Sequence, residues 1–457
     1  MEASRFKAHS LQESPKGQAV QRILAAALQA VDPALAVSKH LSRSGNHLLV
    51  AGQTYDLVSF DSIYVIGAGK AGAPMAMAMS NLLGDKLTSG MVIVKDGYEQ
   101  TGAVEPLQQV EILPAGHPYP DQRSVHATRR ICRLLEDTAR NDLVICLVSG
   151  GGSALLTDPV PGVSLDDLRA LTEVLLSSGA DIQEINTLRK HLDHVKGGNL
   201  ARLVSPSRLL TLILSDVVGN PMDSIASGPT VPDRSTYADA TAVLRKYSLE
   251  DKIPNQIRRV LHLGERGGLP ETPKPGDPLF DQVCNLIIAS NIHAAQAGLA
   301  QAMAEGYNTL LLTTYLQGEA RQAGQFLAGI ARQIADSGQP IPRPACLVAG
   351  GETTVIVTGD GLGGRNQELA LGAVGTLAGV PGATLVCLAT DGGDGPTDAA
   401  GAVVTGETLW RALRLGMDPA EFLRRNDAYH FFDPLGDLLH TGPTLTNVND
   451  LAFLFLH

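Results

Sequence analysis

The sequence IYVI-GAGKAG at residues 63–72 joins a short apolar run to a turn rich in glycine. The same order returns as VICLV-SGGGS at residues 144–153, and again at residues 212–219, 346–354 and 385–395. Short apolar runs of this kind are typical of strands buried on both faces of a parallel sheet. The small polar residues would then follow the carboxyl ends of the strands, where open α/β sheets bind ligands. The pattern therefore predicts an α/β protein that handles phosphorylated small molecules.

The length of the chain, 457 residues, exceeds what one ordinary hydrophobic core organises, so we expect two domains. Strand-like and helix-like stretches alternate from Ile63 to about Thr230 and again from Leu286 onward. We expect a Rossmann-like parallel-sheet domain over residues 17–250 and a smaller α/β domain over residues 284–457, with a cleft between them. Residues 251–283, which are rich in proline and glycine, are the expected linker.

The composition excludes several classes of function. The chain has 36 Lys and Arg against 47 Asp and Glu, a net charge of −11, which argues against general binding to nucleic acids or to anionic membranes. No apolar run reaches the ~18 residues of a membrane span, and Gln18–Val31 is expected as an amphipathic helix rather than a signal peptide. The five cysteines include no CxxC pair, which indicates reduced thiols in a cytoplasmic protein.

The two N-terminal glycine turns are candidate phosphate sites. Residues 67–72 fit the dinucleotide fingerprint G-x-G-x-x-G, but Lys95 stands where an acidic residue would end the next strand, and Asp96 comes only after it. Lys70 would lie at a helix start that repels cations, so it is either a clamp for an anion or a solvated surface lysine. The successive glycines within 149–153 carry a high entropic cost, which favours an anion-binding nest over a bare turn.

Carboxylates follow two of the apolar runs. Asp216 comes just after the run at 212–214, and Asp391 and Asp394 lie in the turn after 385–389. Their hard oxygens suit Mg²⁺, which keeps waters and bridges phosphates. Asp391 and Asp394 each precede glycine, so both could equally be plain turn formers.

Four basic side chains are candidates for contact with an anionic substrate. On a helix, Arg189, Asp193 and Lys196 would share one face, either as a solvated salt-bridged surface or as ligand contacts. Arg365 follows two glycines at a helix start and could hold an anion bidentately, or be an ordinary surface arginine. His117 lies in a loop locked by prolines, where a substrate contact and a structural role are equally open.

Together these stretches resemble the glycerate 2-kinase family, which has a Rossmann-like N-terminal domain and a C-terminal MOFRL domain. The resemblance covers residue 17 to the end of the chain. It is carried by VIGAGKAGAPMA (65–76), HPYPD (117–121), LVSGGGSALL (147–156), INTLRKHLDHVKGGNLA (185–201), LILSDVVGNPMDSIASGPT (212–230), GGETTVIVTGDGLGGRNQELAL (350–371) and ATDGGDGPTDAAGA (389–402).

The resemblance implies ATP-dependent phosphorylation of D-glycerate to 2-phosphoglycerate with Mg²⁺. It implies that Lys70, Asp216 and Arg365 are catalytic residues in an interdomain site. The motifs add three sets of expected site residues. The phosphate-binding residues are Gly67, Gly69, Ser149, Gly150, Gly151, Gly152 and Ser153. The substrate-binding residues are His117, Arg189 and Lys196, and the metal-binding residues are Asp216, Asp391 and Asp394.

Two other functions remain open from the sequence. The fingerprint G-x-G-x-x-G is also compatible with an NAD(P)H-dependent hydroxypyruvate reductase. A non-catalytic sensor of sugar acids or nucleotides would be a different class, although the polar residues crowd more strand ends than simple binding needs.

Overall fold

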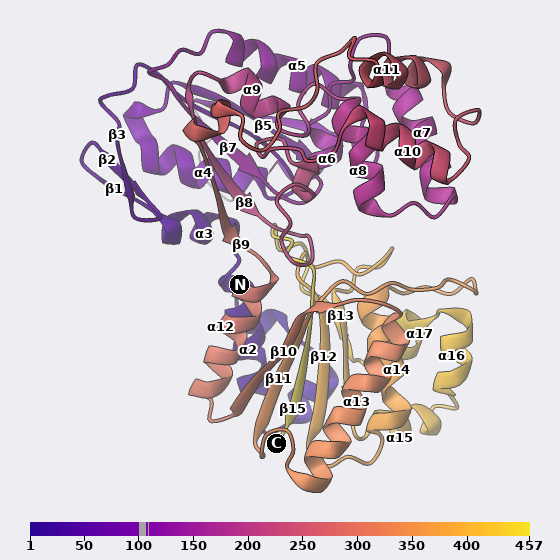
Figure 1. The fold of residues 1–457 in the computed structure, drawn as a ribbon. Helices are drawn as coiled ribbons and strands as arrows, with labels where there is room; N and C mark the ends of the chain where they lie inside the picture. The colour runs from indigo at the N-terminus through magenta and orange to yellow at the C-terminus, as the bar shows by residue number, and fades with distance from the viewer. Residues whose placement is uncertain (100–106, 108) are drawn as a thin grey trace. The chain divides into compact units, whose positions relative to one another are not determined.

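The structure is a computed structural model that describes residues 1–99, 107 and 109–457. The chain divides into two compact units. The parallel-sheet unit is Pro33–Ile288, and the mixed-sheet unit combines Met1–Asp32 with Ala289–His457. Both are α/β units, as the sequence predicts (Figure 1).

The parallel-sheet unit is built on a six-stranded sheet with a Rossmann strand order. Neighbouring strands run in parallel from β6 to β8, and β9 lies at the far edge beside β8. The order reverses between the adjacent strands β4 and β7, which is where open α/β sheets bind ligands. From edge to edge the strands are β6 (Val110–Ala115), β5 (Ser89–Lys95), β4 (Ile63–Ala68), β7 (Leu143–Val148), β8 (Arg208–Leu214) and β9 (Val283–Ala289).

The central strands are buried because their side chains are apolar on both faces. Every residue of β7 is buried, as expected for a strand between two parallel neighbours. Four of the surrounding helices begin with capping boxes, at Asp121, Ser164, Asp181 and Thr236, which fix where those helices start. The helices are α3 (Pro33–His40), α4 (Gly72–Leu83), α5 (Gln122–Glu136), α6 (Gly152–Leu155), α7 (Leu165–Ser177), α8 (Ile182–His191), α9 (Asn199–Val204), α10 (Tyr237–Lys246) and α11 (Asn255–Glu265). A small antiparallel sheet holds β1 (Leu41–Ser44), β2 (His47–Val50) and β3 (Gln53–Asp56).

The segment 251–283 differs from the linker that its proline and glycine content suggests. It contains α11, whose Ile257 and Leu261 are buried against Leu244 of α10. These two residues are four apart, so they share one face of the helix and give it a core to pack on. The next strand, β9, joins the first sheet instead of opening the second unit. The chain passes between the units at residues 32–33 and again at residues 288–289.

The mixed-sheet unit has a second six-stranded sheet with strands in both directions. The C-terminal strand β15 lies between β11 and β12 and is antiparallel to both, so the two glycine-ended strands read from the sequence are not neighbours. β15 carries the run LAFLFL, which is buried throughout. From edge to edge the strands are β10 (Asn308–Leu316), β11 (Ala345–Gly351), β15 (Asp450–Leu456), β12 (Ala383–Ala389), β13 (Gly401–Thr405) and β14 (Leu438–Leu439).

Helices cover this second sheet, and one of them comes from the start of the chain. The N-terminal α2 packs against α12, although the two are far apart in sequence (Figure 1). No single helix in the described ranges is long and apolar enough to cross a membrane; α2 and α3 pass that test only as a pair bent by 64°. The helices are α1 (His9–Glu13), α2 (Gly17–Gln29), α12 (Asn291–Ala304), α13 (Ala320–Ser337), α14 (Arg365–Leu377), α15 (Thr408–Arg414), α16 (Pro419–Arg425) and α17 (Ala428–Phe432).

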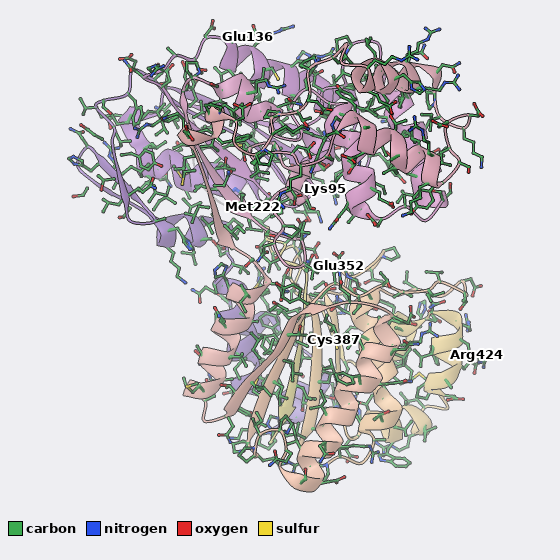
Figure 2. The ribbon with its side chains drawn as sticks, viewed as in Figure 1. Lys95, Glu136, Met222, Glu352, Cys387 and Arg424 are labelled. Atoms are coloured by element: carbon green, nitrogen blue, oxygen red, sulfur yellow. The ribbon has the colours of Figure 1, made fainter. Side chains whose placement is uncertain are left out.

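The cysteines in the apolar runs lie in the core, as their surroundings in the sequence predict. Cys146, Cys346 and Cys387 are buried, and all five cysteines are free thiols. Burial raises the pKa of the Cys146 thiol to about 12. Figure 2 shows Cys387 within the second sheet, whereas Arg424 of α16 lies at the periphery of the same unit.

Helices α13 and α14 cross at a distance that only glycine permits. A Cβ on Gly324 of α13 would lie 2.0 Å from the carbonyl oxygen of Leu369. A Cβ on Gly372 of α14 would lie 2.3 Å from the carbonyl oxygen of Arg321. The two helix backbones are therefore in direct contact, and α14, which begins at Arg365, is held firmly in place.

We expect Gly324→Ala to destabilise the protein by about 1–3 kcal/mol, because the new methyl group must push a backbone carbonyl aside. Gly329→Ala is the matched control on the same helix, since a Cβ there meets nothing within 4 Å. That control should be neutral or stabilise by up to about 1 kcal/mol through helix propensity. Urea unfolding of both variants measures the difference, and equal midpoints would show that the crossing is looser than described.

Candidate active site

The two N-terminal glycine turns pack against each other at the carboxyl ends of β4 and β7. The backbone N–H of Lys70 donates to the carbonyl oxygen of Gly150 at 2.8 Å, and the N–H of Ala71 donates to Oγ of Ser149 at 3.0 Å. Gly69 has φ +143°, and a Cβ there would lie 2.1 Å from that same Oγ. The turns predicted as separate phosphate loops therefore form one structure at the switch point of the sheet.

Some of the predicted phosphate-binding residues hold this structure together. Ser149 is 1% exposed, and its hydroxyl is occupied by the N–H of Ala71. Gly67 lies against β7, where a Cβ would be 2.2 Å from the carbonyl oxygen of Leu147. Gly151 and Ser153, in contrast, line an open pocket.

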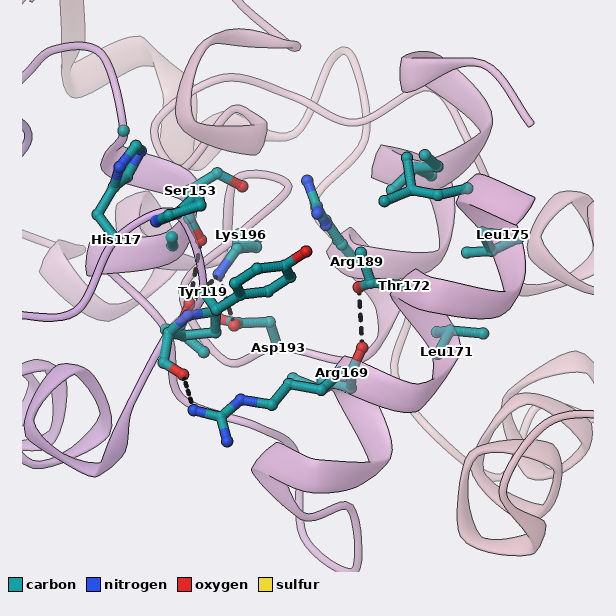
Figure 3. Close-up of a pocket in the computed structure, with 18 residues that line it drawn as sticks. His117, Tyr119, Ser153, Arg169, Leu171, Thr172, Leu175, Arg189, Asp193 and Lys196 are labelled. Carbon is teal, nitrogen blue, oxygen red and sulfur yellow. Dashed lines mark hydrogen bonds and ion pairs between the residues drawn. The ribbon is translucent and has the colours of Figure 1, made fainter. Parts of the chain in front are cut away.

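The pocket has a volume of about 310 Å³ and collects several residues that the sequence singles out. His117, Gly151, Ser153, Arg189 and Lys196 all lie on its wall (Figure 3). The wall also includes residues that the sequence analysis does not name as site residues, among them four leucines of α7. They are Pro118, Tyr119, Pro120, Ala154, Thr157, Leu168, Arg169, Leu171, Thr172, Leu175, Leu176, Ile185 and Asp193.

His117 is a neutral side chain at this pocket. Burial, together with the positive charges of Lys70 and Lys95, lowers the pKa of His117 to about 4. At pH 7 it can donate or accept a hydrogen bond but carries no charge. Gly151 has φ +84°, and a Cβ there would lie 2.9 Å from Nε2 of His117, so this glycine lets the imidazole approach the turn.

A strained turn supports the pocket from the side of β8. Oγ of Ser153 and Oγ of Ser227 are 2.7 Å apart, and the hydroxyl of Ser227 donates to Oδ1 of Asn186 at 2.9 Å. Ala226 and Ser227 have φ of +49° and +60°, which is unfavourable for side chains other than glycine. Such strain is concentrated at functional sites. The run of small residues in SIASGP is the available signal; the sequence analysis uses it for the family resemblance but names none of its residues as a site residue.

Lys196 differs from its expected role as a substrate contact. Its ammonium is buried and donates to the carbonyl oxygen of Leu156, to Oγ1 of Thr157 and, at 2.6 Å, to Oδ2 of Asp193. The side chains of Lys196 and Asp193 are 3% and 1% exposed. Helix α8 ends at His191, so Asp193 and Lys196 lie beyond it rather than on its face. The ion pair forms the floor of the pocket.

Arg189 is different, because its guanidinium forms no hydrogen bond and no ion pair within 4.0 Å with any residue in the described part of the chain. Burial lowers its pKa, and the nearby charge of Asp193 only partly opposes that effect. Desolvating a guanidinium without hydrogen-bond partners is costly. The arrangement therefore favours an anionic ligand at this position.

Lys70 and Asp216 flank the switch point from two strands. Lys70 lies between β4 and α4, and Asp216 follows β8 by two residues. Both are half-buried, and both have interactions within the protein. Their positions at the carboxyl ends of parallel strands are the ones that the sequence predicts.

The predicted metal ligands do not form a cage. No three His, Cys, Asp or Glu side chains of the described residues are gathered so as to hold a metal ion. Asp394 is buried at the start of α14, where its carboxylate accepts the N–H groups of Asn366 and Gln367 at 3.0 and 2.9 Å. It caps this helix instead of being available to a metal. Mg²⁺ usually needs only one or two carboxylates beside substrate phosphates, and Asp216 and Asp391, which belong to different units, each offer one.

Arg365 is already paired with carboxylates of its own unit. It donates from Nε to Asp450 at 2.6 Å, from a terminal nitrogen to the other oxygen of Asp450 at 3.2 Å, and to Glu352 at 2.5 Å. Burial raises the pKa of Asp450 to about 7, and Arg365 opposes this rise. The bidentate fork expected of Arg365 is present, but within this structure it holds Asp450.

Comparisons with known proteins agree with the fold and the motifs. A domain of unknown function, DUF4147, matches residues 19–262, and the MOFRL family matches residues 345–450. A D-glycerate 2-kinase from Thermotoga maritima is 43% identical over 399 residues, which cover 87% of this chain and 92% of the relative. The chain belongs to the glycerate 2-kinase family.

Two further comparisons concern a solved structure and a second relative. The crystal structure of a glycerate kinase from Thermotoga maritima superposes with a TM-score of 0.84 at 40% identity, covering 95% of this chain and 98% of that one. A relative from Agrobacterium vitis is 41% identical and covers 96% of this chain and 94% of its own length; it is provisionally named a hydroxypyruvate reductase.

We expect Arg365→Ala to destabilise the mixed-sheet unit of this protein, because the substitution leaves the carboxylate of Asp450 buried without its counter-charge. The loss should be about 1–3 kcal/mol, below the ~3–5 kcal/mol of a fully buried pair, since the Arg365 side chain is 33% exposed. Adding Asp450→Asn should recover most of it. Thermal unfolding of the single and double variants tests this, and a double variant as unstable as Arg365→Ala would disprove the pairing argument.

Proposed function

We propose that this protein phosphorylates D-glycerate at its 2-hydroxyl group, with ATP as the phosphoryl donor and Mg²⁺ as the cofactor. Membership of the glycerate 2-kinase family supports kinase activity on glycerate. The observation that carries the proposal is the pocket beside Gly151 and Ser153, in which the guanidinium of Arg189 has no hydrogen-bond or ion-pair partner among the described residues. Such a site suits a substrate that carries phosphate groups.

Phosphoryl transfer needs positioned charges more than it needs a covalent nucleophile. In the proposed mechanism the backbone N–H groups of the turn at 149–153 hold phosphate oxygens, because those of Lys70 and Ala71 already donate to Gly150 and Ser149. Lys70 neutralises negative charge on the transferred group, and Arg365 is proposed to add a second cation. Asp216 accepts the proton of the attacking 2-hydroxyl group of glycerate. The hydroxyl oxygen then bonds to the γ-phosphorus as the bond between that phosphorus and the ADP oxygen breaks.

Asp216 and Asp391 are the side chains that we propose hold Mg²⁺ together with the phosphates. When bound, the ion supplies positive charge that shields the phosphate oxygens. His117 is neutral near pH 7, so its imidazole can form a hydrogen bond with a substrate oxygen but adds no positive charge to the site. Arg189 binds a substrate anion.

The second candidate is an NAD(P)H-dependent hydroxypyruvate reductase. The Rossmann strand order and the G-x-G-x-x-G turn after β4 favour it. However, the acid that would hold the ribose is displaced to Asp96, whose two oxygens bind Arg123 at 2.8 and 2.7 Å. That carboxylate is already occupied by a cation, so the kinase is the better-supported function.

One experiment separates these functions. Incubation with ATP, MgCl₂ and D-glycerate should give 2-phosphoglycerate, identified by phosphorus and proton NMR from the carbon that bears the phosphate. EDTA should stop the reaction, and excess MgCl₂ should restore it. A phosphate on the 3-hydroxyl would overturn the regiochemistry, and oxidation of NADH by hydroxypyruvate in place of phosphorylation would favour the reductase.

We expect Lys70→Ala to lower kcat/KM for D-glycerate by about 30- to 1,000-fold, since losing a preorganised charge in the transition state costs about 2–4 kcal/mol. Lys252→Ala, which removes an exposed lysine of the same unit, is the matched control and should leave turnover unchanged. Steady-state kinetics and thermal unfolding measure both effects. A folded Lys70→Ala enzyme with normal turnover would remove Lys70 from the mechanism.

A further inference from the structure

The pocket beside the glycine turns has a polar end and an apolar end. His117 and Ser153 lie toward one side, and Leu171 and Leu175 of α7 lie toward the other (Figure 3). Arg189 and Tyr119 stand between them. A ligand that fills the pocket should therefore be polar at one end, apolar at the other, and anionic where it meets Arg189.

Tyr119 presents an aromatic ring to this pocket. It stands between Pro118 and Pro120, whose rings fix their φ angles, and the carbonyl oxygen of Pro120 accepts a hydrogen bond from Arg169 of α7 at 2.5 Å. The loop is thus tied to the helix that forms the apolar wall. The Tyr119 side chain is 53% exposed, and among the described residues it has no hydrogen-bond, ring-stacking or cation partner. Only 4% of the chain is aromatic, so an exposed ring at a pocket is uncommon here.

The apolar wall does not match glycerate. D-glycerate is a three-carbon acid whose carbons all carry oxygen, so it has almost no apolar surface to bury. The wall instead contains Leu168, Leu171, Leu175 and Ile185. The volume of about 310 Å³ falls at the lower end of the range of roughly 300–1,000 Å³ seen for pockets that bury larger, drug-sized ligands.

A nucleoside matches these features better. A purine has two flat faces, one of which can stack on an aromatic ring while the other packs against leucines. Base–aromatic stacking does not depend on hydrogen bonds to the edge of the base. Arg189, between the two ends, can reach the phosphates that follow the ribose. The glycine turn, through Gly151 and Ser153, lies at the end where those phosphates would arrive.

We infer that this pocket holds the nucleoside part of the phosphoryl donor, with the base against Tyr119 and the α7 leucines and the phosphates toward Gly151 and Ser153. The inference rests on the proposed kinase function only for the identity of the nucleotide. It assigns Arg189 and Tyr119 to the nucleotide and leaves the acceptor acid outside this pocket.

The test is calorimetric titration of the full-length protein with ADP, which needs no turnover. Tyr119→Ala should weaken ADP binding by about 5- to 150-fold, the range of base–aromatic stacking, and Tyr119→Trp should restore it. Inorganic tripolyphosphate, which has no base, should bind wild type and Tyr119→Ala equally. The matched control is Tyr315→Ala, which removes a tyrosine 65% exposed on β10 of the other unit and should leave ADP binding unchanged.

The kinetic constants of the same variants give the remaining outcomes. Tyr119→Ala should raise KM for ATP and leave KM for D-glycerate unaltered. A raised KM for D-glycerate with normal ADP binding would make this the acceptor pocket and overturn the inference. Equal ADP affinity in Tyr119→Ala and Tyr315→Ala would overturn it as well. Failure of the kinase proposal is a separate result, because wild type would then form no phosphoglycerate whatever the ADP titration shows.

Discussion

The close contact of two backbone turns is the constraint on which the candidate site depends. β4 and β7 are adjacent parallel strands, so the turns that follow them must leave the sheet side by side. The turns interlock through the carbonyl oxygen of Gly150 and the hydroxyl of Ser149, with no room for a Cβ at residue 69. The sequence predicts Gly69 as a phosphate contact, but the packing of the two turns against each other already requires a glycine there. The open positions are those further along the turn, where it meets the pocket.

Burial of charge then decides which basic residues can serve a ligand. Lys196 is neutralised by Asp193 at 2.6 Å, and Lys190 lies 3.3 Å from Asp233. Both ion pairs are almost wholly buried, where an unpaired charge would be costly. Arg189 is on the same stretch of chain but lacks such a partner among the described residues. Its guanidinium faces the pocket, so the stretch that looks uniformly basic in the sequence divides into structural pairs and one ligand-facing cation.

The sequence predicts the sheets well because apolar runs such as 144–148 can be satisfied only by burial on both faces. It predicts the strand ends for the same reason, and hence the placement of Lys70, Asp216 and Gly151. It fails where a residue's role depends on a partner distant in the chain. Nothing near Asp394 indicates that it caps α14, and nothing near Arg365 indicates Asp450, 85 residues later. The strand β15 was likewise not identified, although its apolar run was visible.

Helix α8 shows why local spacing was both useful and misleading. Ile185 and Leu188 are buried against α7 and α10, which fixes the rotation of the helix. Asn186 and Arg189, three residues apart, then share the neighbouring face, about 100° further round the helix. Asn186 supports the strained Ser227, and Arg189 enters the pocket. Continuing the same helical count to residues 193 and 196 predicts more ligand contacts, but the helix ends at His191 and the chain turns inward. The end of the helix therefore determines that Asp193 and Lys196 form the floor of the pocket and that Arg189 remains for the ligand.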